Sequence, residues 1–432
     1  MKMSSSKLIT GISLLALGAI ELGCSTKEKT DIKAENVATS EQVNEVLNGG
    51  NAVINILNKP YQFERPQNLN LSDDELNNIS LAMGQQLQIG IDQFLNPQLQ
   101  MPGINRSIII QDFIGQTAAM VESFHPELTQ NMKEFQQNWD HDPKSLIEQL
   151  NKYFTRANYY LYFDFDEKGD IAFNIFPIKK THHLQIKEAS TSENIPVIIL
   201  GSPLVNDLTN MPIEVVAQMD STKQRAMIFD NKIEVATEKI LNQLPQNVLS
   251  TIDRKEFEKC IYEDFLNHES YHVFLAKKYP KTSGITSIDQ TINFPLILEV
   301  APGLELDLSG DYHQAFFHEL AAVGFEITNS QCEFPYLNIL YTTDKKSLPP
   351  TYTLVADAVT LMSLGNLPNS DKKQSILQKM KIDGSLEIGD LRSLIGTDLS
   401  IESSKKVGNF MLTLSHNFFK QIEENLTNNP SK

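Results

Sequence analysis

The spacing of apolar residues changes along the chain, and each change marks a different kind of structure. Over residues 72–154, apolar positions recur at helical intervals. Ser72 and Glu75 stand three residues apart, as in a capping box, and this spacing predicts the start of a helix. We therefore expect residues 52–156 to form an N-terminal helical region.

The next segment has the periodicity of strands. Residues 159–165 alternate in polarity, a turn follows at 166–170, and residues 171–178 form a second predicted strand. Further short strands are expected at 184–187, 196–200, 226–229 and 232–235, the last two joined as a hairpin at Asp230 and Asn231. The pattern predicts a small, mostly antiparallel sheet within a region that spans residues 157–280.

A long helix is predicted after the sheet. Residues 253–279 contain neither Pro nor Gly, and Pro280 follows as a stop signal. The apolar stripe of this segment advances in steps of three or four residues through Phe257, Ile261, Phe265, His268, His272 and Leu275. Further helices are expected at 311–326, 352–364, 371–381, 386–395 and 401–426. The fold class is therefore α+β, with residues 281–432 holding a second site helix and a helical C-terminal subdomain.

Two histidines on the inward face of the long helix carry the candidate chemistry. His268 and His272 belong to a His-Glu-x-x-His sequence, and residues four apart share a helical face, so both imidazoles can bind one metal ion. Glu269 lies beside them, where a carboxylate can accept a proton from metal-bound water. The alternative is a buried helix with two hydrogen-bonded core histidines. The motif and its flanks resemble the signature of the zincin metallopeptidases, which implies a catalytic Zn²⁺ ion.

The third ligand distinguishes the zincin subgroups. Leu275 and Lys278 stand where metzincins have a glycine and a third histidine, and this excludes that subgroup. An E-x-x-A sequence beginning at Glu319, some tens of residues downstream, is similar to the gluzincin arrangement. The resemblance covers residues 253–330, and it implies a zincin-like fold with His268, His272 and Glu319 as zinc ligands.

Other carboxylates are weaker candidates for the third ligand. Glu326 is the main rival, although we interpret it as a solvated carboxylate near the helix end; Glu299 and Glu305 lie in an apolar, extended stretch. Gluzincins often place an aspartate at one of the positions that correspond to 322 and 323, where it orients a histidine ligand. This chain has Ala322 and Val323 there, so an orienting carboxylate must come from elsewhere or be absent.

A group that stabilises the oxyanion is also expected in a hydrolase of this kind. Spacing singles out none of the nearby candidates, Tyr312, His313, His318, Tyr336 and Tyr341. His318 is adjacent to Glu319 and points about a quarter-turn away, so we interpret it as a packing residue. His416 lies off the main apolar stripe of the last helix and is interpreted as a boundary or packing histidine.

The N-terminus is typical of an exported protein. Two lysines precede a mainly apolar run at residues 8–20, and residues 1–23 are expected to be a signal peptide. The run ends at a sequence similar to a bacterial lipobox, which predicts lipidation of Cys24, with an ordinary secreted or periplasmic protein as the alternative. Ser25 favours the outer membrane if the cell is Gram-negative. Residues 24–51 are polar and are expected to be a flexible tether.

The net charge limits the partners that the chain can have, and the positions of two cysteines allow a disulfide. The formal net charge of −17 excludes nucleic acid as a partner, and membrane contact is expected only through the lipid anchor. Cys260 and Cys332 flank the two site helices. If these helices run antiparallel, both cysteines lie towards the same end, and a disulfide is possible there; the alternative is two buried thiols.

Together these patterns predict a membrane-tethered zinc metallopeptidase that acts on a peptide or protein, with Glu269 as general base. One alternative is a catalytically inactive zincin-fold envelope lipoprotein that acts as a binding or scaffolding protein. Another is a lipoprotein without metal, in which the motif is coincidental.

Overall fold

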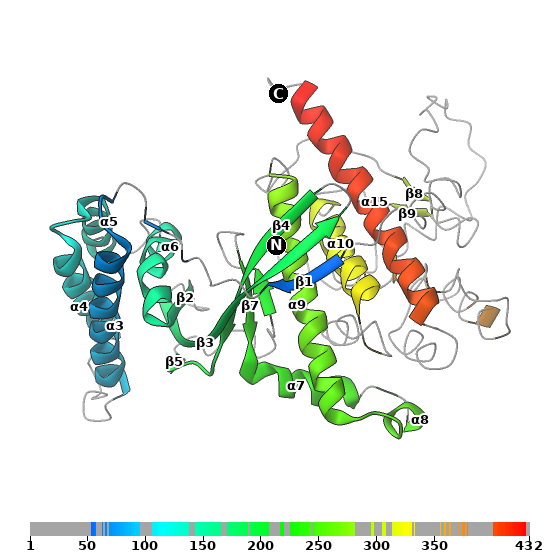
Figure 1. Cartoon of the computed structure of the whole chain (residues 1–432), viewed down its shortest axis with the longest axis horizontal. Coiled ribbons are helices and arrows are strands. Elements are labelled where there is room, and N and C mark those ends of the chain that lie inside the picture. Colours follow the sequence, from blue (N-terminus) through cyan, green and yellow to red (C-terminus); the bar gives the residue numbers. More distant parts are fainter. Residues whose placement is uncertain are drawn as a thin grey trace, which may run out of the picture. The chain divides into compact units, whose positions relative to one another are not determined.

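The computed structural model of the chain is shown in Figure 1. It describes residues 53–57, most of 63–95, 106–137, 143–165, 171–188, 191–206, 217–219, most of 225–280, 295–297, 305–307, 313–330, Cys332, single positions between 355 and 378, and 401–428. The predicted signal peptide, the tether and Cys24 lie outside the described residues. Within the described part of the chain, no helix is both long and apolar enough to cross a membrane.

The chain divides into two compact units. One comprises Met1–Asn55, Gln185–Glu193 and Ile233–Lys432, and the other comprises Ile56–Leu184 and Asn194–Lys232. This division differs from the boundaries expected from the sequence. Most of the sheet belongs with the N-terminal helices, whereas the long helix that carries His268 belongs with the C-terminal part.

Four helices in the second unit confirm the helical pattern predicted for residues 72–154. They are α3 (Asp73–Leu95), α4 (Arg106–Val121), α5 (Pro126–Gln137) and α6 (Pro143–Phe154), followed by the short 3₁₀ helix η2 (Thr155–Ala157). The capping box before α3 is formed, since the Ser72 backbone N–H donates to Glu75 at 2.7 Å and the Glu75 N–H donates to the Ser72 hydroxyl at 3.2 Å. Their shared core includes Leu76, Met83, Leu87, Met132, Phe135, Leu150 and Phe154.

The sheet has the order β1-β3-β4-β7-β6, with β2 and β5 also paired to β3. The strands are β1 (Val53–Leu57), β2 (Tyr159–Phe165), β3 (Ile171–Glu188), β4 (Thr191–Leu200), β5 (Val205–Asn206), β6 (Ala217–Met219) and β7 (Ala226–Phe229). The pairs β2–β3, β3–β5 and β6–β7 are antiparallel, whereas β4 and β7 are parallel. The fold therefore mixes helices and sheet, compatible with the α+β class.

Two of the expected strands are wrong in extent or type. Residues 184–187 are the end of the long strand β3, and residues 232–235 lie inside the helix α7 (Asp230–Leu241), so no hairpin forms at Asp230. A four-residue alternation fits a helix equally well, and Ile233, Ala236 and Ile240 are buried at helical spacing. Moreover, β7 already pairs with β4 and β6, so neither of its sides is open to a hairpin partner.

Three long helices of the first unit position the candidate site (Figure 1). They are α9 (Arg254–Lys278), α10 (His313–Asn329) and α15 (Ile401–Asn428), and α10 packs against both others. A Cβ atom on Gly324 of α10 would lie 2.8 Å from the carbonyl oxygen of Gly408 on α15, so these two helices meet backbone to backbone. The short helix α8 (Gln246–Leu249) precedes α9, and the antiparallel pair β8 (Pro295–Ile297) and β9 (Glu305–Asp307) lies between α9 and α10 in the sequence.

Candidate metal centre

The helix α9 begins at a strong cap and presents its histidines to the interior. The Asp253 carboxylate accepts hydrogen bonds from the backbone N–H groups of Lys255 at 2.9 Å and Glu256 at 3.1 Å. His268 and His272 lie four residues apart on the buried face, with exposed fractions of only 4% and 8%. Two imidazoles buried side by side need polar partners, and α10 supplies them.

Glu319 on α10 faces both imidazoles. Its Oε2 atom lies 3.4 Å from Nε2 of His268, and its Oε1 atom lies 3.5 Å from Nε2 of His272. The two Nε2 atoms are 3.2 Å apart. The structure thus brings together the three residues predicted as ligands, and this buried group could hold a metal ion.

The electrostatics of this triad favour a cation. Burial raises the pKa of the Glu319 carboxyl, but the two imidazoles outweigh burial and hold that pKa well below its usual range. Burial lowers the pKa of His268, but Glu319, Glu326 and Glu269 outweigh it and raise that pKa well above its usual value. In addition, the buried Oε2 atom of Glu319 has no hydrogen-bond partner among the residues that the structure describes. The negative field and the oxygen left without a hydrogen bond are both features of a cation site.

Glu326 has a different role from the one expected. It is fully buried rather than solvated, and its Oε2 atom lies 3.1 Å from Nδ1 of His268. The Nδ1–H group donates to this carboxylate, which leaves the Nε2 lone pair directed at Glu319. Glu326 is therefore the orienting carboxylate that sequence reasoning did not find at positions 322 and 323. The signal was its spacing of seven residues from Glu319, which puts both on one face of α10.

Glu269, the predicted general base, follows His268 on α9 and is half-buried. Its carboxylate contributes to the raised pKa of His268, so its charge acts directly on the triad. This proximity is what a proton acceptor beside a bound cation requires.

His318 and the other expected oxyanion candidates divide into two groups. The rings of His318 and His272 are stacked with centroids 6.3 Å apart, and His318 also contacts Phe419 of α15 at 4.7 Å. His318 therefore lies beside the triad and packs on α15, as its interpretation as a packing residue implies. Tyr336 and Tyr341 lie outside the described residues, as do Glu299, Tyr312 and the side chains of Glu305 and His313.

His416 belongs to a second, half-buried cluster around Glu188, the last residue of β3. One Glu188 oxygen accepts from Lys278 at 2.6 Å, and the other accepts from His416 at 2.7 Å and from Tyr271 at 3.0 Å. Tyr279 completes the cluster, with its hydroxyl 2.8 Å from Nδ1 of His416. Burial raises the pKa of Glu188, but His416 and Lys278 outweigh it and lower that pKa to about 2. This cluster joins β3, α9 and α15.

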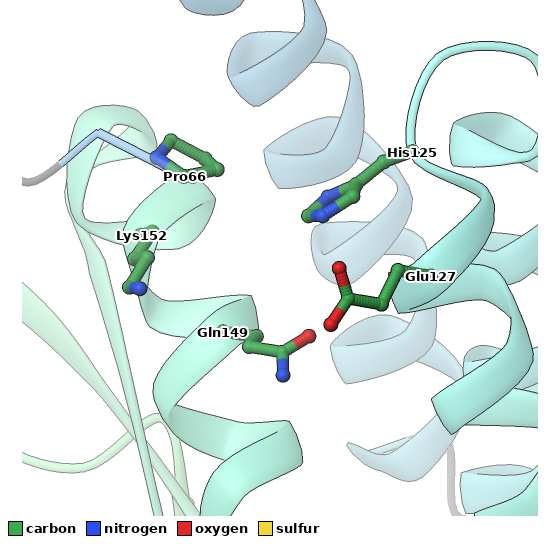
Figure 2. A pocket seen from close by; sticks show the side chains of 5 residues that line it. All are labelled: Pro66, His125, Glu127, Gln149 and Lys152. Atoms are coloured by element: carbon green, nitrogen blue, oxygen red, sulfur yellow. The ribbon is translucent and has the colours of Figure 1, made fainter. Parts of the chain in front are cut away.

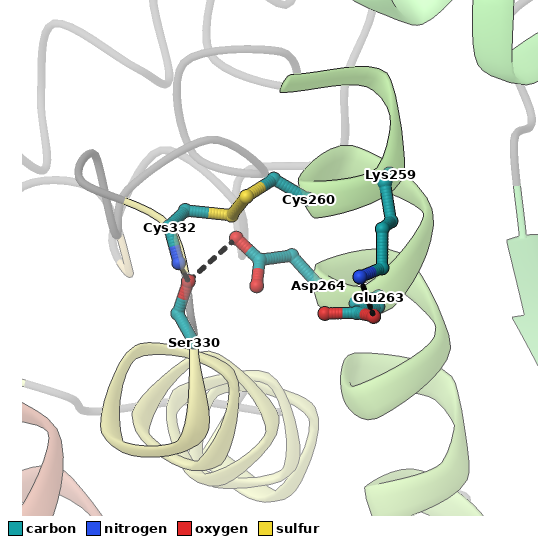
Figure 3. Close-up of a disulfide and its surroundings, with 6 residues drawn as sticks. All are labelled: Lys259, Cys260, Glu263, Asp264, Ser330 and Cys332. Atoms are coloured by element: carbon teal, nitrogen blue, oxygen red, sulfur yellow. Dashed lines mark hydrogen bonds and ion pairs between the residues drawn. A yellow bond between two sulfur atoms is a disulfide. The ribbon is translucent and has the colours of Figure 1, made fainter. Parts of the chain in front are cut away.

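Cys260 and Cys332, for which the sequence left a disulfide possible, do form one (Figure 3). It lies towards the opposite end of α9 from the metal triad. Cys260 lies near the start of α9 and Cys332 follows α10, with their Cα atoms 5.5 Å apart. Beside the disulfide, the Ser330 hydroxyl donates to Oδ2 of Asp264 at 3.2 Å. Asp264 is fully buried, and burial together with the charge of Glu326 raises its pKa well above the usual range.

A small polar pocket lies in the other unit, lined by Pro66, His125, Glu127, Gln149 and Lys152 (Figure 2). Nδ1 of His125 is 2.7 Å from the Tyr153 hydroxyl. Burial lowers the pKa of His125, while Glu127 and Lys152 act on it in opposite directions. Nothing in this pocket resembles the ligand set of the triad.

Comparison with known proteins gives no further identification. No family model, no curated protein and no solved structure matches this chain. What this chain does must therefore be argued from the geometry of its own residues.

Proposed function

We propose that the chain is a zinc-dependent metallopeptidase. The observation that carries the proposal is the convergence of His268, His272 and Glu319, whose ligand atoms all lie within 4.8 Å of one another in a buried position. Two imidazoles and one carboxylate are the protein ligands of a common class of catalytic zinc site, in which the fourth position is left to water.

The distances within the triad suit zinc. Bonds of about 2.0–2.2 Å to a tetrahedral zinc ion place neighbouring ligand atoms roughly 3.3–3.6 Å apart. The two Nε2 atoms, 3.2 Å apart, lie close to that range, and each has a different oxygen of Glu319 at 3.4 or 3.5 Å. Glu326 also supplies the carboxylate partner that a zinc-bound histidine usually has on its other ring nitrogen.

The chain's own residues would then divide the work of hydrolysis. When bound, zinc would lower the pKa of a coordinated water towards about 7 and polarise the peptide carbonyl. The Glu269 carboxylate would accept the proton of the attacking water and deliver it to the leaving amine. Glu326 would keep Nδ1 of His268 protonated, so that Nε2 stays available as a ligand. The burial of both histidines would exclude bulk water from the ligand face of α9.

The cellular location follows from sequence features alone. We propose that residues 1–23 are removed, that Cys24 carries the lipid, and that residues 24–51 tether the enzyme to the cell envelope. The substrate class is a peptide or protein outside the cytoplasm.

Metal content of the purified full-length chain tests this proposal. We expect about one zinc ion per wild-type chain, and its loss in His272→Ala and in Glu319→Ala. Glu263→Ala is the matched control, because Glu263 lies on α9 but pairs with Lys259 at 3.9 Å, outside the triad. A folded, metal-free wild type would refute the proposal. A chain that holds zinc but hydrolyses no peptide would be a binding or scaffolding protein instead.

A further inference from the structure

Four cross-links join α9 to α10 and the residues just after it, in register. Cys260, Asp264, His268 and His272 follow one another at intervals of four residues along a single face of α9. Their partners come in reverse order along the chain: Cys332, Ser330, Glu326 and Glu319. These four contacts form an antiparallel series, which we call the ladder, and each contact is a rung. The disulfide is the rung at one end, and the contact between His272 and Glu319 of the metal triad is the rung at the other.

The Asp264–Ser330 rung connects the two ends. The Cys332 backbone N–H donates to the Ser330 hydroxyl at 3.1 Å, so the residue that forms the disulfide also fixes the serine. Ser330 in turn donates to Asp264, and its backbone N–H donates to the carbonyl oxygen of Glu326 at 2.8 Å. Each residue of this rung is four positions from a residue of the metal site: Asp264 from His268, and Ser330 from Glu326.

Asp264 has no evident role apart from this rung. Its side chain is fully buried, and within the described part of the chain its second oxygen, Oδ1, has no hydrogen-bond partner. A buried carboxylate with only one partner is costly to the fold, and a nearby Glu326 carboxylate adds repulsion. Buried carboxylates with strongly shifted pKa values are common at functional sites.

We propose that Asp264 and Ser330 are positioning residues of the metal site, which transmit the helix register fixed by the Cys260–Cys332 disulfide to His268 and Glu326. The proposal rests on the metal site of the proposed function. Opening the disulfide takes two electrons and two protons, which a dithiol reductant supplies as it becomes a disulfide itself, and leaves two thiols. Without the covalent link the rung loses its anchor, and the metal affinity falls.

The expected size follows from comparable support groups. Removing a residue that orients a metal ligand typically costs about 10- to 100-fold in metal affinity. Because coupling between two sites is reciprocal, bound metal should make the disulfide harder to reduce by the same factor.

The test is the Co²⁺ affinity of the full-length chain, measured by competition with a chelator, together with the visible spectrum of the bound ion. We expect Cys260→Ser/Cys332→Ser and Ser330→Ala each to lose about 10- to 100-fold in affinity. The triple variant should lose little more than either, because all three changes break one path. The serine pair is used in place of reductant so that free thiols do not bind the metal.

Two controls separate positioning from general destabilisation. Lys259→Ala removes the Lys259–Glu263 pair on the same turns of α9, away from the ladder (Figure 3), and should leave the affinity unchanged. Gly408→Ala disturbs the contact of α15 with α10 and should lower the unfolding temperature without altering the Co²⁺ spectrum. Unchanged affinity in the folded serine pair, or additive losses in the triple variant, would overturn the inference. No Co²⁺ binding by the wild type would instead refute the proposed function.

Discussion

The first unit contains two clusters of charged side chains, one half-buried around Glu188 and one around Glu319, and they differ in how their charge is balanced. Around Glu188, a lysine, a histidine and a tyrosine all donate to one carboxylate. Around Glu319, the partners among the described residues are two imidazoles, and a second carboxylate, Glu326, lies behind one of them. The Glu188 cluster is complete with protein groups alone, whereas the triad has an excess of acceptors. The comparison teaches that an unbalanced buried cluster is the better candidate for a cation site.

The largest effect should come from the group that acts on the reaction. We expect Glu269→Gln to lower kcat for hydrolysis of an unfolded protein substrate by about 10²- to 10⁴-fold, because the amide cannot accept a proton. Zinc content should stay near one per chain. A variant that kept wild-type turnover would remove Glu269 from the mechanism.

Breaking the Glu188 cluster should lower the stability of the fold and leave the zinc content unchanged. Glu188→Gln leaves the Lys278 ammonium without its carboxylate, and the expected loss is about 1 to 3 kcal/mol in the free energy of unfolding. Denaturant titration measures this loss, and metal analysis of the same sample should still find zinc. Loss of zinc without loss of stability would contradict the distinction between the clusters.

Removal of the metal should also distinguish the Glu188 cluster from the Glu319 triad. At a free zinc concentration of about 1,000 times Kd, the ion stabilises the native state by about 4 kcal/mol. Thermal unfolding with and without chelator should show this shift in the wild type and in Glu188→Gln. Glu319→Ala should unfold at the same temperature under both conditions.

The pH dependence of stability should reveal Glu188. Its pKa is about 2 in the folded chain, below the ordinary value of 4.5, so its contribution is present above pH 4.5 and is lost as the pH falls towards 2. A shift of this size corresponds to about 3 kcal/mol. Unfolding free energies between pH 6 and pH 2.5 should fall more steeply for the wild type than for Glu188→Gln. Parallel curves would show that the carboxylate is not specifically stabilised.

The sequence predicted most of what depends on neighbours along one helix. The spacing of His268 and His272 and the capping box at Ser72 are local features, and the structure contains both. Glu319 was expected from the resemblance of its E-x-x-A sequence to the gluzincin arrangement, and the structure places it beside both histidines.

What the sequence did not predict depends on distant partners. Glu326 resembled a solvated helix-end residue because nothing along the chain indicates that it is buried against His268 of α9. The Glu188 cluster joins residues separated by up to 228 positions, so no local pattern could reveal it. The expected hairpin at Asp230 was wrong because a four-residue alternation does not distinguish a strand from one helical turn.

The close crossing of α10 and α15 has a consequence for fragments of this chain. A product that ended before Ile401 would retain both histidines, Glu269 and Glu319 in its sequence. It would nevertheless expose apolar rings on α10, among them Phe317, whose centroid lies 4.0 Å from that of Phe418 on α15. Such a truncated protein would be expected to aggregate before it could bind a metal ion. The His-Glu-x-x-His sequence in such a fragment would then not indicate an ability to bind metal. The helix that completes the fold, α15, carries none of the ligands.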